Sequence, residues 1–98
     1  MTAVVLTRDL MDGSRFRAAL PEVTVARSLD TPGLDGASLI LLDLALGIDV
    51  GAVVALGPPV VAYGAHVDTE ALAGAVAAGC VEAVPRSRVF RRAIELLS

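Results

Sequence analysis

The sequence has a single Cys, no Trp, Lys, Asn or Gln, and only three aromatic residues. Cys80 cannot form an intrachain disulfide, and it has no second Cys with which to build a thiolate metal site. This usage is typical of proteins from a reducing compartment, so we expect a cytoplasmic location. Because the apolar residues are chiefly Ala, Val and Leu, the core is expected to consist of small aliphatic side chains.

Long hydrophobic runs are also missing. The longest stretch without a formal charge, residues 50–67, is broken by Gly51, Gly57, Pro58, Pro59 and Gly64, which argues against a membrane span. No basic segment followed by an apolar run opens the chain, so no secretory signal is predicted. We therefore expect no membrane association.

Length and composition indicate one small folded domain, residues 1–98. The hydrophobic fraction is 55%, mean hydropathy is +0.71 and only 19% of residues are charged, which excludes a disordered chain. Arg86, Arg88, Arg91 and Arg92 are dense in positive charge, but subtracting them from the total of −3 leaves −7 elsewhere. Nucleic acid is therefore not an expected partner.

Five short apolar runs predict strands at residues 3–6, 23–26, 38–42, 59–62 and 81–84. They lack strict alternation, as do strands of a parallel sheet that is buried on both faces. Helical patterns at residues 12–20, 69–79 and 88–97 fall between or after them. The predicted fold class is α/β with a doubly wound five-stranded parallel sheet. Residues 28–37 leave room for only about one helical turn, so the second crossover helix should be shortened.

Candidate site residues follow the strands, because ligands of open α/β sheets bind at the carboxyl ends of the strands. Asp43 stands out as a carboxylate that comes directly after the buried run Leu-Ile-Leu-Leu. The other strand ends carry Thr7, Arg8, Asp9, Tyr63, Gly64, Pro85 and Arg86. Read alone, Asp43 is also a candidate cap for the crossover that follows it, as Asp9 and Asp12 are for the first helix.

Three segments resemble the receiver domain of two-component response regulators: residues 38–44, 59–65 and 72–80. The third ends in Ala-Gly-Cys, similar to the family's Ala-Gly-Ala turn. The resemblance implies the strand order 2-1-3-4-5 and places a phosphoacceptor at Asp43.

The expected neighbours of that aspartate depart from the family's pattern. In the family an acidic pair after the first strand holds Mg²⁺. At those positions this chain has Thr7 and Arg8, or Arg8 and Asp9 if the register shifts by one residue. A guanidinium offers Mg²⁺ no oxygen ligand. Gly64 replaces the switch Ser or Thr and has no hydroxyl, while the family's Lys falls near Arg86, which can still pair with an anion.

These departures lead to a specific hypothesis: Arg8 pairs with Asp43 and stands where Mg²⁺ would be. The protein would then be a stand-alone, atypical pseudo-receiver, not an enzyme and without a cofactor, that acts through protein contacts. Its partner would be a signalling protein or a second copy of the chain. By resemblance, the partner-binding face would be formed by Ala71, Ala75, Ala78, Arg88, Arg91 and Arg92.

Two alternatives remain open. In the first, the protein is a working response regulator phosphorylated on Asp43 by a histidine kinase, with Asp9 and Asp43 holding Mg²⁺. In the second, it binds a small molecule or nucleotide, since this architecture serves many functions. The second ranks last, because residues 7–13 contain one glycine and lack the spacing of a phosphate-binding loop.

Overall fold

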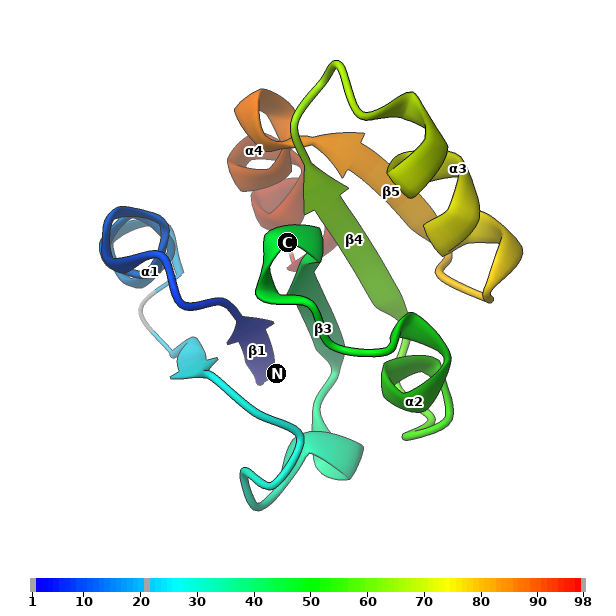
Figure 1. The fold of residues 1–98 in the computed structure, drawn as a ribbon. Helices are drawn as coiled ribbons and strands as arrows, with labels where there is room; N and C mark the ends of the chain where they lie inside the picture. The colour runs from blue at the N-terminus through cyan, green and yellow to red at the C-terminus, as the bar shows by residue number, and fades with distance from the viewer. Residues whose placement is uncertain (1, 21, 98) are drawn as a thin grey trace.

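The computed structural model, which describes residues 2–20 and 22–97, contains one five-stranded sheet (Figure 1). All pairings are parallel and the strand order is β2-β1-β3-β4-β5. The predicted fold class and strand order are therefore confirmed. The strands are β1 (Ala3–Leu6), β2 (Thr24–Ala26), β3 (Leu39–Asp43), β4 (Val60–Gly64) and β5 (Glu82–Pro85).

The three central strands are buried on both faces, which explains why they read as continuous apolar runs. On one face Val5, Leu41 and Val61 pack with helices α1 (Leu10–Ala19) and α4 (Arg86–Leu97). The other face packs with α2 (Val50–Val54), α3 (Thr69–Ala77) and two 3₁₀ turns. The sheet is thus the middle layer of three.

Side-chain caps fix where the helices begin. Asp9 accepts hydrogen bonds from the amides of Met11 and Asp12, so α1 begins two residues before the predicted 12–20. The sequence places Pro21 where it would end this helix, and this residue lies outside the described residues. Asp68 caps α3 through the amide of Ala71. Within the described ranges, no helix combines the length and apolarity needed to cross a membrane.

The second crossover is as short as predicted, with a single 3₁₀ turn at Leu34–Gly36. The third crossover is also reduced, to a 3₁₀ turn at Leu44–Leu46 and the five-residue α2. Leu34, Leu46 and Val53 are buried and cover the face of the sheet that packs with α2 and α3. Short turns suffice here because each contributes a buried side chain to the core.

Gly79, at the turn between α3 and β5, offers a test of close packing. Its φ is +115°, and a Cβ atom there would lie 2.8 Å from Cγ1 of Val54. Gly57 has a φ of +108° but no heavy atom within 4 Å of its Cβ position. Both Gly→Ala variants should lose about 1–2 kcal/mol through backbone strain, and Gly79→Ala a further ~1–2 kcal/mol through overpacking. Urea denaturation measures both, and equal losses would contradict the packing argument.

Candidate functional site: an arginine among three aspartates

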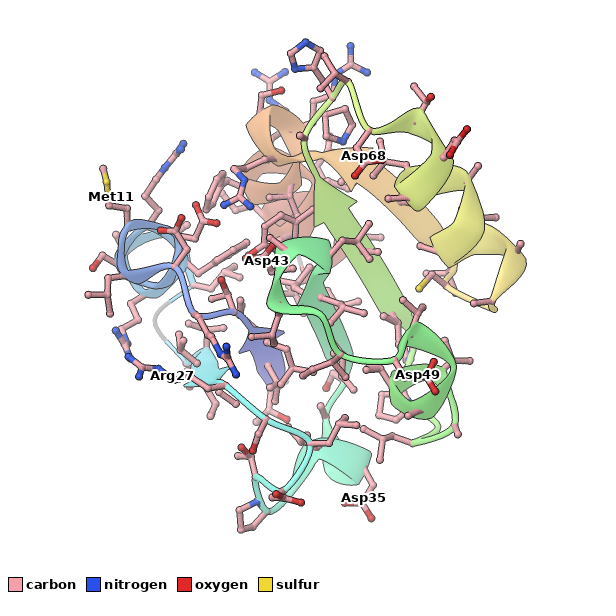
Figure 2. The ribbon with its side chains drawn as sticks, in the orientation of Figure 1. Met11, Arg27, Asp35, Asp43, Asp49 and Asp68 are labelled. Carbon is pink, nitrogen blue, oxygen red and sulfur yellow. The ribbon has the colours of Figure 1, made fainter. Side chains whose placement is uncertain are left out.

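The polar side chains at the carboxyl ends of β1, β3 and β4 lie on one side of the sheet. Side chains alternate along a strand, so Asp43 shares the face of Leu41, and Tyr63 the face of Val61. Asp43 and Tyr63 are also register partners. Thr7, Asp43 and Tyr63 are all buried, with at most 3% of their surface exposed. Asp43 therefore lies inside the molecule at the end of β3 (Figure 2).

Both carboxylate oxygens of Asp43 are engaged. The Thr7 hydroxyl donates to Oδ2 over 2.7 Å, and the Ala45 amide donates to Oδ1 over 3.0 Å. Nη2 of Arg86 donates to the same Oδ1 over 3.2 Å. Asp43 thus caps the 3₁₀ turn that follows it and also anchors a guanidinium.

Arg86, the first residue of α4, extends into a group of three carboxylates. Nη1 contacts Oδ2 of Asp12 and lies 3.5 Å from Oδ2 of Asp9, while Nη2 contacts Asp43. Its guanidinium carbon lies 5.3 Å from the ring centroid of Tyr63, a distance at which the ring face attracts a cation. Burial lowers the pKa of Arg86, but the carboxylates of Asp43 and Asp12 outweigh it and raise the pKa above its usual value. The side chain therefore remains a cation.

Asp12 is the member of the cluster that sequence reasoning missed as a site residue. The sequence makes Asp12 a candidate cap, but the cap is Asp9, and Asp12 points inward from the first turn of α1 with 5% of its surface exposed. Burial raises the pKa of Asp12, the Arg86 guanidinium opposes that rise, and the Asp9 and Asp43 carboxylates add to it. The Tyr63 hydroxyl donates to Asp12 over 3.5 Å. The sequence does contain a sign of this orientation. Asp12 lies one helical turn before the core residue Phe16, so the two side chains share the inward face of α1.

The predicted pairing of Arg8 with Asp43 is wrong, since the guanidinium at Asp43 belongs to Arg86. The reason is the two-residue period of a strand: Thr7 follows β1 on the same side as Val5 and reaches Asp43. Arg8, the next residue, is exposed and lines a hollow beside β2. Neither of the two registers left open holds as stated: Thr7 contacts Asp43 and Asp9 approaches Arg86, but Arg8, which both registers place in the pair, is exposed.

Gly64 ends β4 beside the cluster and supplies no hydroxyl. A Cβ atom there would lie 3.5 Å from Cδ1 of Leu44, an ordinary contact. The hollow next to it, which Leu44, Ala71 and Arg86 line, therefore has room for a small side chain at this position.

The predicted partner-binding face is only partly exposed. Ala75 is 2% exposed and packs in the core, so its assignment to this face is wrong. Nε of Arg92 donates to both carboxylate oxygens of Glu82, over 3.0 and 2.8 Å, and Nη1 of Arg92 lies 3.6 Å from Oε1 of Glu95. Hydrogen bonding to Arg92 lowers the pKa of Glu82. Ala71 is half-buried, whereas Ala78, Arg88 and Arg91 are exposed.

The receiver resemblance implies a Mg²⁺ ion at this cluster, and the present arrangement does not fit one. Mg²⁺ binds oxygen ligands at about 2.0–2.1 Å in near-octahedral geometry. Here the guanidinium of Arg86 contacts oxygens of Asp12 and Asp43 and approaches Asp9. Among the residues described, no group of three or more His, Cys, Asp or Glu is arranged to hold a metal.

Comparison with solved structures identifies the fold. A response regulator from Thermotoga maritima superposes with a TM-score of 0.67 at 16% identity, covering 98% of this chain and 92% of that chain. A CheY-like protein from Pseudomonas aeruginosa has a TM-score of 0.65 at 18% identity, covering 96% and 93%. The chain has the CheY-like receiver fold.

A third structure with this fold is a putative pilus assembly-related protein from Burkholderia pseudomallei. Its TM-score is 0.70 at 14% identity, covering 99% of this chain and 86% of that chain. No protein-family model matches the sequence, and no curated protein matches it either. The similarity that these comparisons detect is therefore one of backbone geometry.

Replacing Arg86 should destabilise the fold in a pH-dependent way. Arg86→Gln leaves Asp12 and Asp43 buried without a cation, so the pKa of Asp12 should rise further. Removing one partner of a buried pair costs about 3–5 kcal/mol, and because Arg86 is 33% exposed we expect a loss of about 2 kcal/mol at pH 7.

This loss should shrink as the pH falls. A raised pKa means that the folded state binds the proton more tightly, so the variant regains stability as the pH drops through the folded pKa of Asp12. Urea denaturation at pH 7 and at about pH 4.5 measures the difference from wild type. Arg91→Gln, on the exposed part of the same helix, is the control and should change stability by less than about 0.5 kcal/mol. A deficit independent of pH would contradict this assignment.

Proposed function

We propose that this protein is a receiver-fold signalling module that acts through protein contacts, without Mg²⁺-dependent phosphorylation of Asp43. The observation that supports this is the Arg86 guanidinium, which contacts the carboxylates of Asp12 and Asp43. Arg86 takes the role that the sequence-based hypothesis gave to Arg8, namely pairing with Asp43 in place of Mg²⁺. The proposed function is otherwise the one expected from the sequence. The module is not an enzyme in this proposal, because its aspartate is held as a structural group.

Phosphoryl transfer to a carboxylate needs two features that this arrangement weakens. The accepting oxygen must be nucleophilic, and the hydrogen bonds that both oxygens of Asp43 accept lower their nucleophilicity. The charge that develops between two anions must also be neutralised by a cation that can contact the incoming phosphoryl group. The Arg86 guanidinium is instead directed at Asp12 and Asp43. Gly64 supplies no hydroxyl at the end of β4 to hold a phosphoryl oxygen.

Output through contacts requires a surface that the internal pairs leave free. Arg88, Arg91 and Ala78 remain exposed on α4 and at the end of α3. Arginine is enriched at interfaces, and small residues permit close approach. The proposed partner is a signalling protein or a second copy of the chain, and Arg86 would keep this surface in one conformation.

A second candidate function is the phosphoacceptor, and one observation favours it. Asp9, Asp12 and Asp43 place three carboxylates around one guanidinium, so the cluster carries an excess of negative charge. If Arg86 moved into solvent, Asp9 and Asp43 would be free to hold Mg²⁺ and a histidine kinase could phosphorylate Asp43. This function requires the ion pairs to break first.

Two-dimensional amide NMR with Mg²⁺, followed by beryllofluoride as a phosphoryl mimic, distinguishes the two functions. For the wild-type chain we expect no saturable shifts around Asp43. Arg86→Ala, its fold checked by the dispersion of its amide signals, should gain Mg²⁺-dependent shifts at the ends of β1 and β3. Wild-type shifts that disappear in Asp43→Ala would establish the phosphoacceptor instead. No gain in Arg86→Ala would show that Arg86 is not what excludes the metal.

A further inference from the structure

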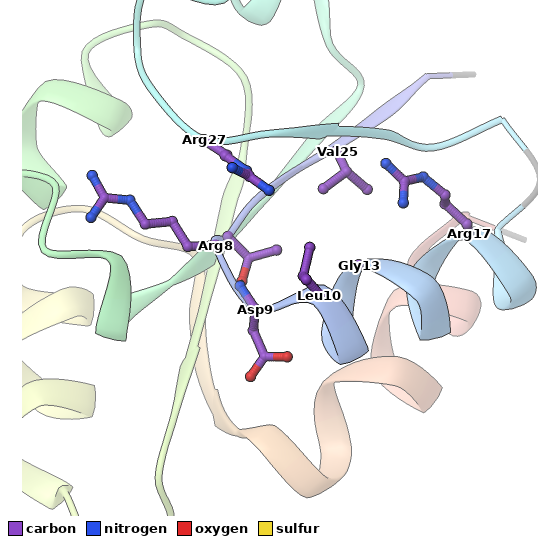
Figure 3. Close-up of a pocket in the computed structure, with 8 residues that line it drawn as sticks. Arg8, Asp9, Leu10, Gly13, Arg17, Val25 and Arg27 are labelled. Atoms are coloured by element: carbon purple, nitrogen blue, oxygen red, sulfur yellow. The ribbon is translucent and has the colours of Figure 1, made fainter.

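A second group of arginines consists of Arg8 after β1, Arg27 after β2 and Arg17 in the last turn of α1. A hollow of about 80 Å³ opens there between the start of α1 and β2 (Figure 3). It is lined by three basic residues, Arg8, Arg17 and Arg27, and by Leu10, Gly13 and Val25. Arg8 follows β1 and Arg27 follows β2, so the hollow lies at the edge of the sheet where open α/β proteins bind ligands.

The positive charge of this hollow is not neutralised within the described part of the chain. No carboxylate of residues 2–20 or 22–97 forms an ion pair with Arg8, Arg17 or Arg27, whereas Arg86 and Arg92 are both paired. The chain as a whole is acidic, at −3. Three arginines without a carboxylate partner are therefore gathered at one hollow of an acidic chain.

The one acid that lines the hollow, Asp9, is committed elsewhere. Its Oδ1 accepts hydrogen bonds from the amides of Met11 and Asp12, and its Oδ2 lies 3.5 Å from Arg86. Figure 3 shows its carboxylate directed away from Arg17 and Arg27. The potential in the hollow is thus set by guanidinium groups, which favours an anion.

Two of the guanidinium groups lie on either side of the hollow. In Figure 3 Val25 stands between the side chains of Arg17 and Arg27, all three of which line the hollow, while Arg8 points away from both. Gly13 keeps the space between them open: a Cβ atom there would lie 3.5 Å from Cγ1 of Val25 and 3.9 Å from Nη1 of Arg17. Exposed side chains change rotamer within nanoseconds, so Arg8 is within reach as a third donor.

We propose that this hollow binds the phosphate group of a small phosphomonoester. Guanidinium forks match the oxygens of phosphate and donate charge-assisted hydrogen bonds to them. The volume of about 80 Å³ exceeds the roughly 10–15 Å³ that one water molecule needs on the same measure, so the hollow has room for a phosphate group. Leu10, which is 73% exposed at the rim, offers an apolar contact for the group that the phosphate esterifies. This site is independent of the function proposed for Asp43.

The test is a two-dimensional amide NMR titration of the full chain with inorganic phosphate, against chloride at matched ionic strength. We expect saturable shifts in residues around Arg17 and Arg27 with phosphate only. Losing both arginines should weaken binding by roughly tenfold or more, so the Arg17→Gln, Arg27→Gln double variant should lose the response. Arg91→Gln, an exposed arginine outside the hollow, should retain it.

A second titration, with adenosine monophosphate against adenosine, identifies the source of the phosphate. Tighter binding of the monophosphate than of inorganic phosphate, with no response to adenosine, would assign a phosphomonoester. Equal binding would keep the anion site but overturn the ester. Shifts that chloride reproduces, that persist in the double variant, or that centre on Asp43 and α4 would overturn the site itself.

Discussion

The carboxyl end of the sheet depends on one guanidinium. Arg86 joins the start of α4 to Asp12 of α1 and to Asp43 of β3, three elements that are far apart in the sequence. Burying two carboxylates without a cation would cost several kcal/mol, because neither would recover its hydration. With Arg86 present, and with Thr7, Ala45 and Tyr63 as donors, no buried side-chain nitrogen or oxygen of the described residues lacks a partner.

A cation on a side chain differs from a bound ion in ways that affect function. Mg²⁺ exchanges with solvent and keeps coordination positions that a substrate can occupy, whereas Arg86 is tethered and always charged. Its donors are directed at oxygens of Asp12 and Asp43. In the function proposed above, such a site has its stabilising charge at every metal concentration, and the same charge is unavailable to an incoming phosphoryl group. The same contact would then stabilise the fold and limit the chemistry of the site.

The fold could be predicted from the sequence because burial on both faces leaves a direct signature. Leu39 to Leu42 are all buried, so the run is apolar without alternation, and the rule on strand ends then located Asp43. The identity of the partner of Asp43 was not predictable in this way. It depends on which side of the sheet each residue after β1 faces, and a one-residue difference separates Thr7 from Arg8.

Asp12 was missed because an acid in the first turn of a helix looks the same whether it caps or points inward. Ala75 was misplaced because α3 is apolar on nearly every side, so its buried face leaves no pattern.

Asp9 shows how the two arginine groups are related. It lines the hollow beside β2, but its oxygens serve the α1 cap and the approach to Arg86. If this carboxylate faced the hollow, it would offset much of the charge of Arg17 and Arg27. The cluster around Arg86 therefore collects the nearby acids of α1 and β3, and the arginines at the ends of β1 and β2 are left without them. Asp9 caps α1 through Oδ1 and directs Oδ2 toward Arg86. This orientation keeps negative charge at the Arg86 cluster and leaves positive charge at the hollow beside β2.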